Sequence, residues 1–104
     1  MLVQINTDKN IEGNNRFNEF FTEEITTQFE RFDSMVTRFE VHISDENGSK
    51  PGKKDKKCVI EARVEKKQPI VVSAFADTTE KSFFEAMEKM ERSLDATLEK
   101  IKEY

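Results

Sequence analysis

The chain has 104 residues, enough for one domain, and carries a formal net charge of -4. Its single cysteine excludes an internal disulfide, and no stretch approaches the ~18 consecutive apolar residues of a membrane-spanning helix. The N-terminal segment lacks the basic start and apolar run of a secretion signal, so we expect one domain over residues 1–104, a cytoplasmic location and no membrane partner.

Positive charge gathers in one part of this acidic chain. Residues 1–47 hold four basic against ten acidic side chains, residues 48–67 hold eight against three, and residues 68–104 hold five against eight. At the centre of the basic block, the run KPGKKDKK contains five lysines: Lys50, Lys53, Lys54, Lys56 and Lys57. Such a run either grips a polyanion or only keeps an exposed loop solvated, and the sequence supports both interpretations.

The N-terminal part of the chain predicts a strand followed by an amphipathic helix. Residues 2–6 have the alternation of a short strand, and turn residues then lead to a helix over residues 16–32 with an asparagine cap. Its apolar side chains form one stripe, which we expect in the core: Phe17, Phe21, Ile25, Phe29 and Phe32. Acidic side chains, among them Glu19 and Glu23, lie on the other side of this helix.

Three strands and a lysine-rich loop occupy the middle of the chain. Residues 36–44, 58–65 and 70–75 either alternate apolar and polar side chains or are rich in β-branched residues, as strands are. The connection over residues 45–57 contains the lysine run together with a proline and a glycine. We expect it to be a mobile loop between antiparallel strands.

A second long helix is predicted at the C-terminal end. Asp77 and Glu80 have the spacing of a capping box at its start. Apolar residues then recur at helical spacing: Phe83, Met87, Met90, Leu94, Leu98 and Ile101. This stripe predicts a helix with one face buried along its whole length.

The element order β-α-β-β-β-α predicts an α+β domain. Its economical arrangement is a mixed four-stranded sheet with both helices packed on one face, the first two strands being parallel neighbours. The other face of the sheet is then exposed and carries charged side chains: Arg38, Glu40, His42, Glu61, Arg63 and Glu65.

Catalytic and metal chemistry find little support in this sequence. The strand alternation directs His42 outward and Cys58 into the core, so the two should not meet as a nucleophile and its base. They are the only histidine and cysteine, too few for a Cys/His metal site, and three glycines do not make a phosphate-binding loop. We therefore expect a protein that is not an enzyme, with no cofactor and no small-molecule substrate.

The β-β-β-α part of the order resembles double-stranded-RNA-binding domains, which contact the shape of A-form RNA through phosphates and riboses. Two sets of basic residues are candidate RNA contacts. One is the lysine run, and the other lies on the last helix: Lys81, Lys89, Arg92 and Lys100. The alternative for the helix is a solvated face with spaced ion pairs such as Glu85 with Lys89 and Glu88 with Arg92.

Over its whole length the sequence resembles the ribosome hibernation-promoting factor and ribosome-associated inhibitor A family. The segment 89–94, KMERSL, is similar to the family's Lys-Leu-x-Arg-Gln-Leu on the last helix. The opening strand at residues 3–6 and the acidic entry at residues 77–86 are also similar. The chain departs from the family in Ser93 for the usual glutamine, in its acidic first helix and in its longer, more basic loop.

This resemblance implies a function on the ribosome. Family members bind the small subunit in the channel used by mRNA and tRNAs, block initiation and keep idle ribosomes intact in stationary phase and stress. Carried onto this sequence, Lys89 and Arg92 would contact rRNA phosphates, with Lys81 and Lys100 as weaker contacts and ribosomal proteins as further partners. The alternative is a non-ribosomal protein-interaction module on the same scaffold, using its acidic helix face.

Overall fold

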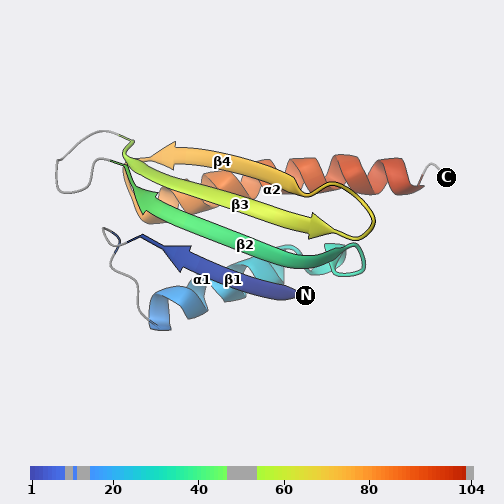
Figure 1. Cartoon of the computed structure of the whole chain (residues 1–104), viewed down its shortest axis with the longest axis horizontal. Coiled ribbons are helices and arrows are strands. Elements are labelled where there is room, and N and C mark those ends of the chain that lie inside the picture. The colour runs from blue at the N-terminus through green and yellow to red at the C-terminus, as the bar shows by residue number, and fades with distance from the viewer. Residues whose placement is uncertain (9–10, 12–14, 47–53, 103–104) are drawn as a thin grey trace.

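The computed structural model describes residues 1–8, 11, 15–46 and 54–102 (Figure 1). Its elements are the strands β1 (Leu2–Thr7), β2 (Val36–Asp45), β3 (Lys56–Val64) and β4 (Ile70–Ala76), the helices α1 (Asn15–Gln28) and α2 (Thr79–Lys102), and the short 3₁₀ helix η1 (Glu30–Phe32). This order confirms the predicted β-α-β-β-β-α fold. Most of the predicted mobile loop, residues 47–53, lies outside the described residues.

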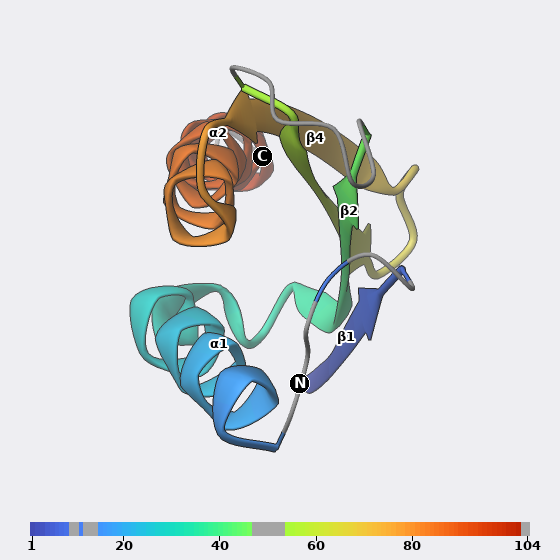
Figure 2. The same cartoon turned by 90° about the vertical axis from the view of Figure 1, so that its left-hand side faces the viewer.

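The four strands form one mixed sheet in the order β1-β2-β3-β4. Strand β1 is parallel to β2, while β2, β3 and β4 are antiparallel neighbours. Figure 2 shows α1 and α2 on the same side of the curved sheet, as predicted. The crossover from β1 through α1 to β2 therefore covers one half of this face, and α2 covers the other half.

The first helix is shorter than predicted. Helix α1 ends at Gln28, and a 3₁₀ turn follows in which the Phe32 amide donates to the Phe29 carbonyl at 2.9 Å. In a 3₁₀ helix residues three apart lie directly above one another, so this turn directs Phe29 and Phe32 to the same side. Both rings are fully buried. The prediction of a continuous helix over residues 16–32 is thus wrong in its last turn.

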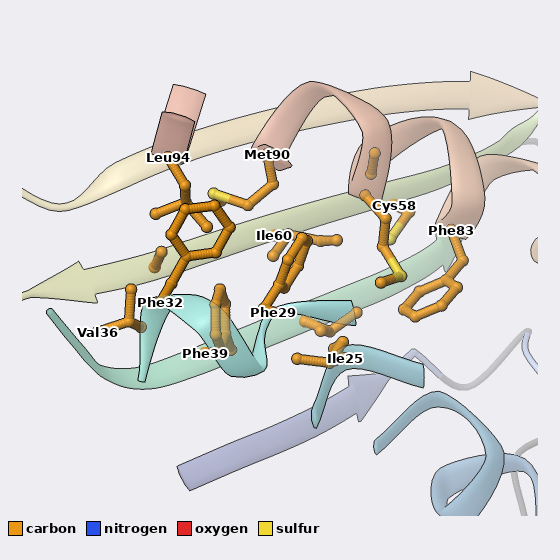
Figure 3. Packing of buried hydrophobic residues seen from close by; sticks show 14 of the residues in the cluster. Ile25, Phe29, Phe32, Val36, Phe39, Cys58, Ile60, Phe83, Met90 and Leu94 are labelled. Carbon is orange, nitrogen blue, oxygen red and sulfur yellow. The ribbon is translucent and has the colours of Figure 1, made fainter. Parts of the chain in front are cut away.

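Aromatic rings join the two helices to the sheet in the core (Figure 3). The Phe29 ring stacks on the Phe39 ring of β2 with 5.1 Å between their centroids. The ring centroids of Phe21 in α1 and Phe83 in α2 lie 4.0 Å apart. Aliphatic and sulfur-containing side chains of β2, β3 and α2 fill the remaining space. The core therefore extends under both helices as one layer, which fixes how α2 lies against the sheet.

The start of α2 is capped by Thr78 and not, as predicted, by Asp77. The Thr78 hydroxyl accepts a hydrogen bond from the Lys81 amide at 3.1 Å, and the Thr78 carbonyl accepts one from the Ser82 amide at 3.1 Å. Because its carbonyl takes the first helical bond, Thr78 occupies the N-cap position. The Asp77 carboxylate instead pairs with the Lys81 ammonium at 3.4 Å.

We expect Thr78→Ala to lower the free energy of unfolding by about 1 kcal/mol, because the Lys81 amide loses its acceptor. Urea denaturation monitored by circular dichroism measures this change. The matched control is Asp77→Ala, which removes only an exposed ion pair and should cost less than Thr78→Ala. A larger loss for Asp77→Ala would return the cap to the position predicted from the sequence.

Candidate nucleic-acid interface

The open face of the sheet carries arginines whose charge is already compensated. Arg38 bonds the Glu40 carboxylate, and Arg63 lies 3.4 Å from Glu61 and 3.9 Å from Glu40. The hydrogen bond from Arg38, supported by Glu61 and by the nearby arginine charges, lowers the pKa of Glu40. This network leaves the sheet face with little free positive charge for a polyanion.

Two lysines of the KPGKKDKK run are paired with acids of the same hairpin. Lys56 is half-buried, with its ammonium 2.9 Å from Asp55 and 3.4 Å from Asp45. These contacts, led by the hydrogen bond to Asp55, raise the pKa of Lys56. Lys57 lies 3.9 Å from Glu46 and 5.5 Å from the centre of the Phe75 ring. This part of the run therefore presents less net charge than its sequence indicates.

Lys54 of the lysine run lies near the start of α2. Lys50 and Lys53 lie outside the described residues, whereas Lys54 is exposed, with a positive φ of 55°. Lys54 and Lys81 line one hollow of about 370 Å³, together with acidic residues of α2 and the segment before it. The structure thus brings the end of the loop beside the first of the predicted helix contacts.

The central residues of the KMERSL segment, Lys89 and Arg92, are both exposed on α2. The Lys89 ammonium donates to the Ser73 carbonyl of β4 at 2.8 Å, so it covers part of the sheet edge. The alternative ion pairs Glu85–Lys89 and Glu88–Arg92 are not among the salt bridges formed within the described part of the chain. Arg92 has no acidic partner among those residues and is available to a ligand.

A second hollow, of about 670 Å³, lies between the β3–β4 turn and the C-terminal half of α2. Lys66, Lys67 and Lys100 line it, with Val64 and Ile70 as its apolar part. None of these three lysines forms an ion pair with another described residue. Of these three lysines only Lys100 is a contact predicted from the sequence, since Lys66 and Lys67 lie in the connection between two predicted strands. The sequence signal that could have identified them is the lysine doublet itself, because it lies next to a hairpin that returns toward the last helix.

Figure 1 shows α2 beside β4, with which it is in contact. We give the name basic flank to the cations of α2 and of the two loops near its ends: Lys54, Lys66, Lys67, Lys81, Lys89, Arg92 and Lys100. At 1.5 Å per residue, Lys81 and Lys100 lie ~28 Å apart along the helix. Asp77 and Glu85 interrupt the positive charge at the end near the loop. The basic flank can contact several phosphates of one polyanion, because four of its seven cations follow one another along α2.

The sole histidine and cysteine lie on opposite sides of the sheet, as predicted. His42 is exposed and Cys58 is fully buried, although their strands are neighbours. Burial raises the pKa of the Cys58 thiol to about 12. In the described ranges no three histidine, cysteine or acidic side chains come together as a metal site.

We expect Cys58 to react with iodoacetamide roughly 1,000-fold more slowly in the folded protein than in urea, because only the thiolate is nucleophilic. The unfolded thiol ionises near pH 9, whereas the folded one stays protonated to about pH 12. Its contribution to the free energy of unfolding is therefore lost as the pH rises between these values. Mass spectrometry follows the alkylation, and Cys58→Ala is the control for the pH series. Equal labelling rates in both states would contradict a buried thiol.

Fold and surface together define a small α+β domain that offers a polyanion one flank of cations. The family model described as "Sigma 54 modulation protein / S30EA ribosomal protein" matches residues 4–102, so the chain belongs to this family of ribosome-associated factors. The family resemblance predicted from the sequence is confirmed. None of the helices in the described ranges has the length and apolar character needed to cross a membrane.

Solved structures share this fold, among them the following two. The N-terminal domain of Protein Y from Thermus thermophilus is 13% identical, with a TM-score of 0.72 over 93% of this chain and 99% of that chain. A ribosomal subunit interface protein from Coxiella burnetii is 16% identical, with a TM-score of 0.68 over 93% of this chain and 97% of that chain. No curated protein matches the sequence.

Proposed function

We propose that this protein binds the small ribosomal subunit in the cytoplasm and silences or protects idle ribosomes, in stationary phase and under stress. The basic flank supports this proposal, because it gathers cations of α2, of the β3–β4 turn and of the end of the lysine-rich loop in an otherwise acidic molecule. The bound polyanion is rRNA in the channel used by mRNA and tRNAs. Family membership over residues 4–102 supplies the ribosome as the setting.

Binding on this flank needs no covalent chemistry. Lysine ammonium groups act as point charges that bind phosphate with little geometric demand, and the Arg92 guanidinium adds a planar fork for two phosphate oxygens. Each phosphate that is neutralised releases condensed counterions, so affinity falls as salt rises. Inhibition follows from occupancy, because a domain bound in the channel excludes mRNA and tRNA.

The individual residues have different roles in this proposal. Arg92 and Lys100 are primary phosphate contacts because they are exposed and have no acidic partner among the described residues. Lys89 binds phosphate from a fixed position, since its bond to the Ser73 carbonyl holds the ammonium at the sheet edge. Lys81 is a weaker contact beside Asp77. The lysine run adds an electrostatic tether.

Sedimentation of stationary-phase extracts through sucrose gradients tests the function. At low salt the protein is expected with the small subunit and with whole ribosomes, and raising the salt is expected to move it to the top of the gradient. Adding purified protein to empty ribosomes should also reduce the binding of initiator tRNA. A protein that stays at the top of the gradient at low salt would rule out this function.

A further inference from the structure

Two aromatic rings are exposed where α1 and α2 face each other. Phe20 of α1 is 44% exposed and Phe84 of α2 is 38% exposed. Their ring centroids lie 6.2 Å apart in an edge-to-face arrangement, and each ring also contacts a buried phenylalanine beside it. The core thus reaches the surface here, at a place that the proposed RNA contacts do not use.

Carboxylates continue this aromatic surface along both helices. Glu24 follows Phe20 by four residues and Glu88 follows Phe84 by four, so each lies one turn further on the same side of its helix. The Glu91 carboxylate accepts a hydrogen bond from Gln28 of α1 at 3.5 Å, which places it on the side of α2 that faces α1. Neither Glu24 nor Glu88 pairs with a cation among the described residues. We call these five side chains, Phe20, Glu24, Phe84, Glu88 and Glu91, the acidic-aromatic patch.

The aromatic part of the patch and the Lys89 part of the basic flank lie on different sides of α2, and Glu88, one turn before Arg92, lies between them. Lys89 reaches β4 on one side of the helix, whereas Phe84 and Glu91 reach α1 on the other. Figure 2 shows α1 below α2 on the side away from β4. A phosphate bound at Lys89 is therefore kept apart from Glu91, and the carboxylates of the patch repel RNA.

We infer that the acidic-aromatic patch docks a basic segment of another protein, rich in arginine and carrying apolar side chains. Arginine fits both components, because its guanidinium pairs with carboxylates and stacks on phenylalanine rings. Apolar side chains of the segment cover the exposed parts of Phe20 and Phe84. The match of charge favours this partner over RNA. The inference goes beyond ribosome binding and does not depend on it.

A synthetic peptide of alternating arginine and leucine tests this site, with the same peptide carrying glutamate for arginine as its control. Fluorescence anisotropy measures affinity, and NMR amide shifts locate the bound peptide. We expect saturable binding of the basic peptide only, with shifts on the facing sides of α1 and α2. Glu88→Lys is expected to weaken it about tenfold, because an attractive contact becomes a repulsive one. Phe84→Ala is expected to have a similar effect.

The matched control is Glu85→Lys, an identical charge change at an exposed position of the same helix, beside Lys54 and Lys81. It is expected to leave peptide affinity unchanged within about twofold and to raise the affinity for a short structured RNA. Glu88→Lys keeps the test valid if Phe84→Ala disturbs folding. Absent peptide binding, equal losses from Glu85→Lys and Glu88→Lys, RNA-induced shifts at the patch, or self-association through the patch would each overturn the inference.

Discussion

The double variant Arg92→Glu with Lys100→Glu is expected to bind the small ribosomal subunit between about tenfold and about 100-fold more weakly than the wild type. Each substitution removes a cation that binds phosphate and adds a repulsive charge at the same place. The dependence of affinity on salt should also become shallower, by about one unit of slope for each phosphate that is no longer neutralised. Equilibrium binding of labelled protein to purified subunits at several salt concentrations measures both quantities.

The matched control for this variant is Lys54→Glu with Lys57→Glu in the lysine run. It also reverses two positive charges, but Lys57 already lies beside Glu46 and contributes less free charge. We expect the loop variant to lose less affinity than the helix variant. Wild-type affinity in the helix variant, or a larger loss in the loop variant, would move the RNA site away from α2. Lys89→Glu is a poorer choice, because it would also break the bond to Ser73.

Much of the fold follows from short-range patterns in the sequence. Alternation of period two directs His42 outward and Cys58 inward, and both lie as predicted. The helical stripe on α2 is buried from Phe83 to Leu94, but Ile101 is 40% exposed, because the stripe extends past the sheet that would cover it. The end of α1 was missed because the spacing of Phe29 and Phe32 fits an α-helix as well as a 3₁₀ turn. Only their packing on β2 decides between these two geometries.

The candidate site was harder to predict than the fold, because it depends on which charges find partners. The sequence shows the density of lysines but not that Asp45 and Lys56 are opposite each other in the sheet. The sequence also does not show that the turn with Lys66 and Lys67 lies beside Lys100. These lysines come together only because β4 packs along α2. Both facts are tertiary. They shift the expected phosphate contacts from the lysine run toward the C-terminal half of α2.

Helix α2 separates two kinds of surface in this domain. Its buried side holds the core, its β4 side carries Lys89, and its α1 side carries Phe84 and Glu91. A net charge of -4 is compatible with RNA binding, because cations without an acidic partner among the described residues, such as Arg92 and Lys100, remain available to phosphates. One bound domain can contact rRNA on one side and a basic protein segment on the other.

The separation of these surfaces depends on a rigid core, and Phe29→Ala tests that core directly. We expect a loss of about 3–5 kcal/mol in the free energy of unfolding, because the truncation leaves a cavity beside Phe39 and Phe32. The total free energy of unfolding of such a domain is about 5–15 kcal/mol, so the variant should be close to unfolding. Urea denaturation measures the loss, and Phe29→Leu, expected to cost less than the alanine variant, covers the case of a variant that does not fold.

The control for Phe29→Ala is Phe20→Ala, the same substitution at a position within α1. Phe20 is 44% exposed, whereas Phe29 is fully buried, so the control is expected to cost about 1 kcal/mol or less. The 3₁₀ turn explains why the difference should be this large. It brings Phe29 onto the Phe39 ring at 5.1 Å, where the surrounding strands cannot collapse into the space that it leaves. Similar losses for both variants would mean that the end of α1 is not fixed to the sheet by Phe29.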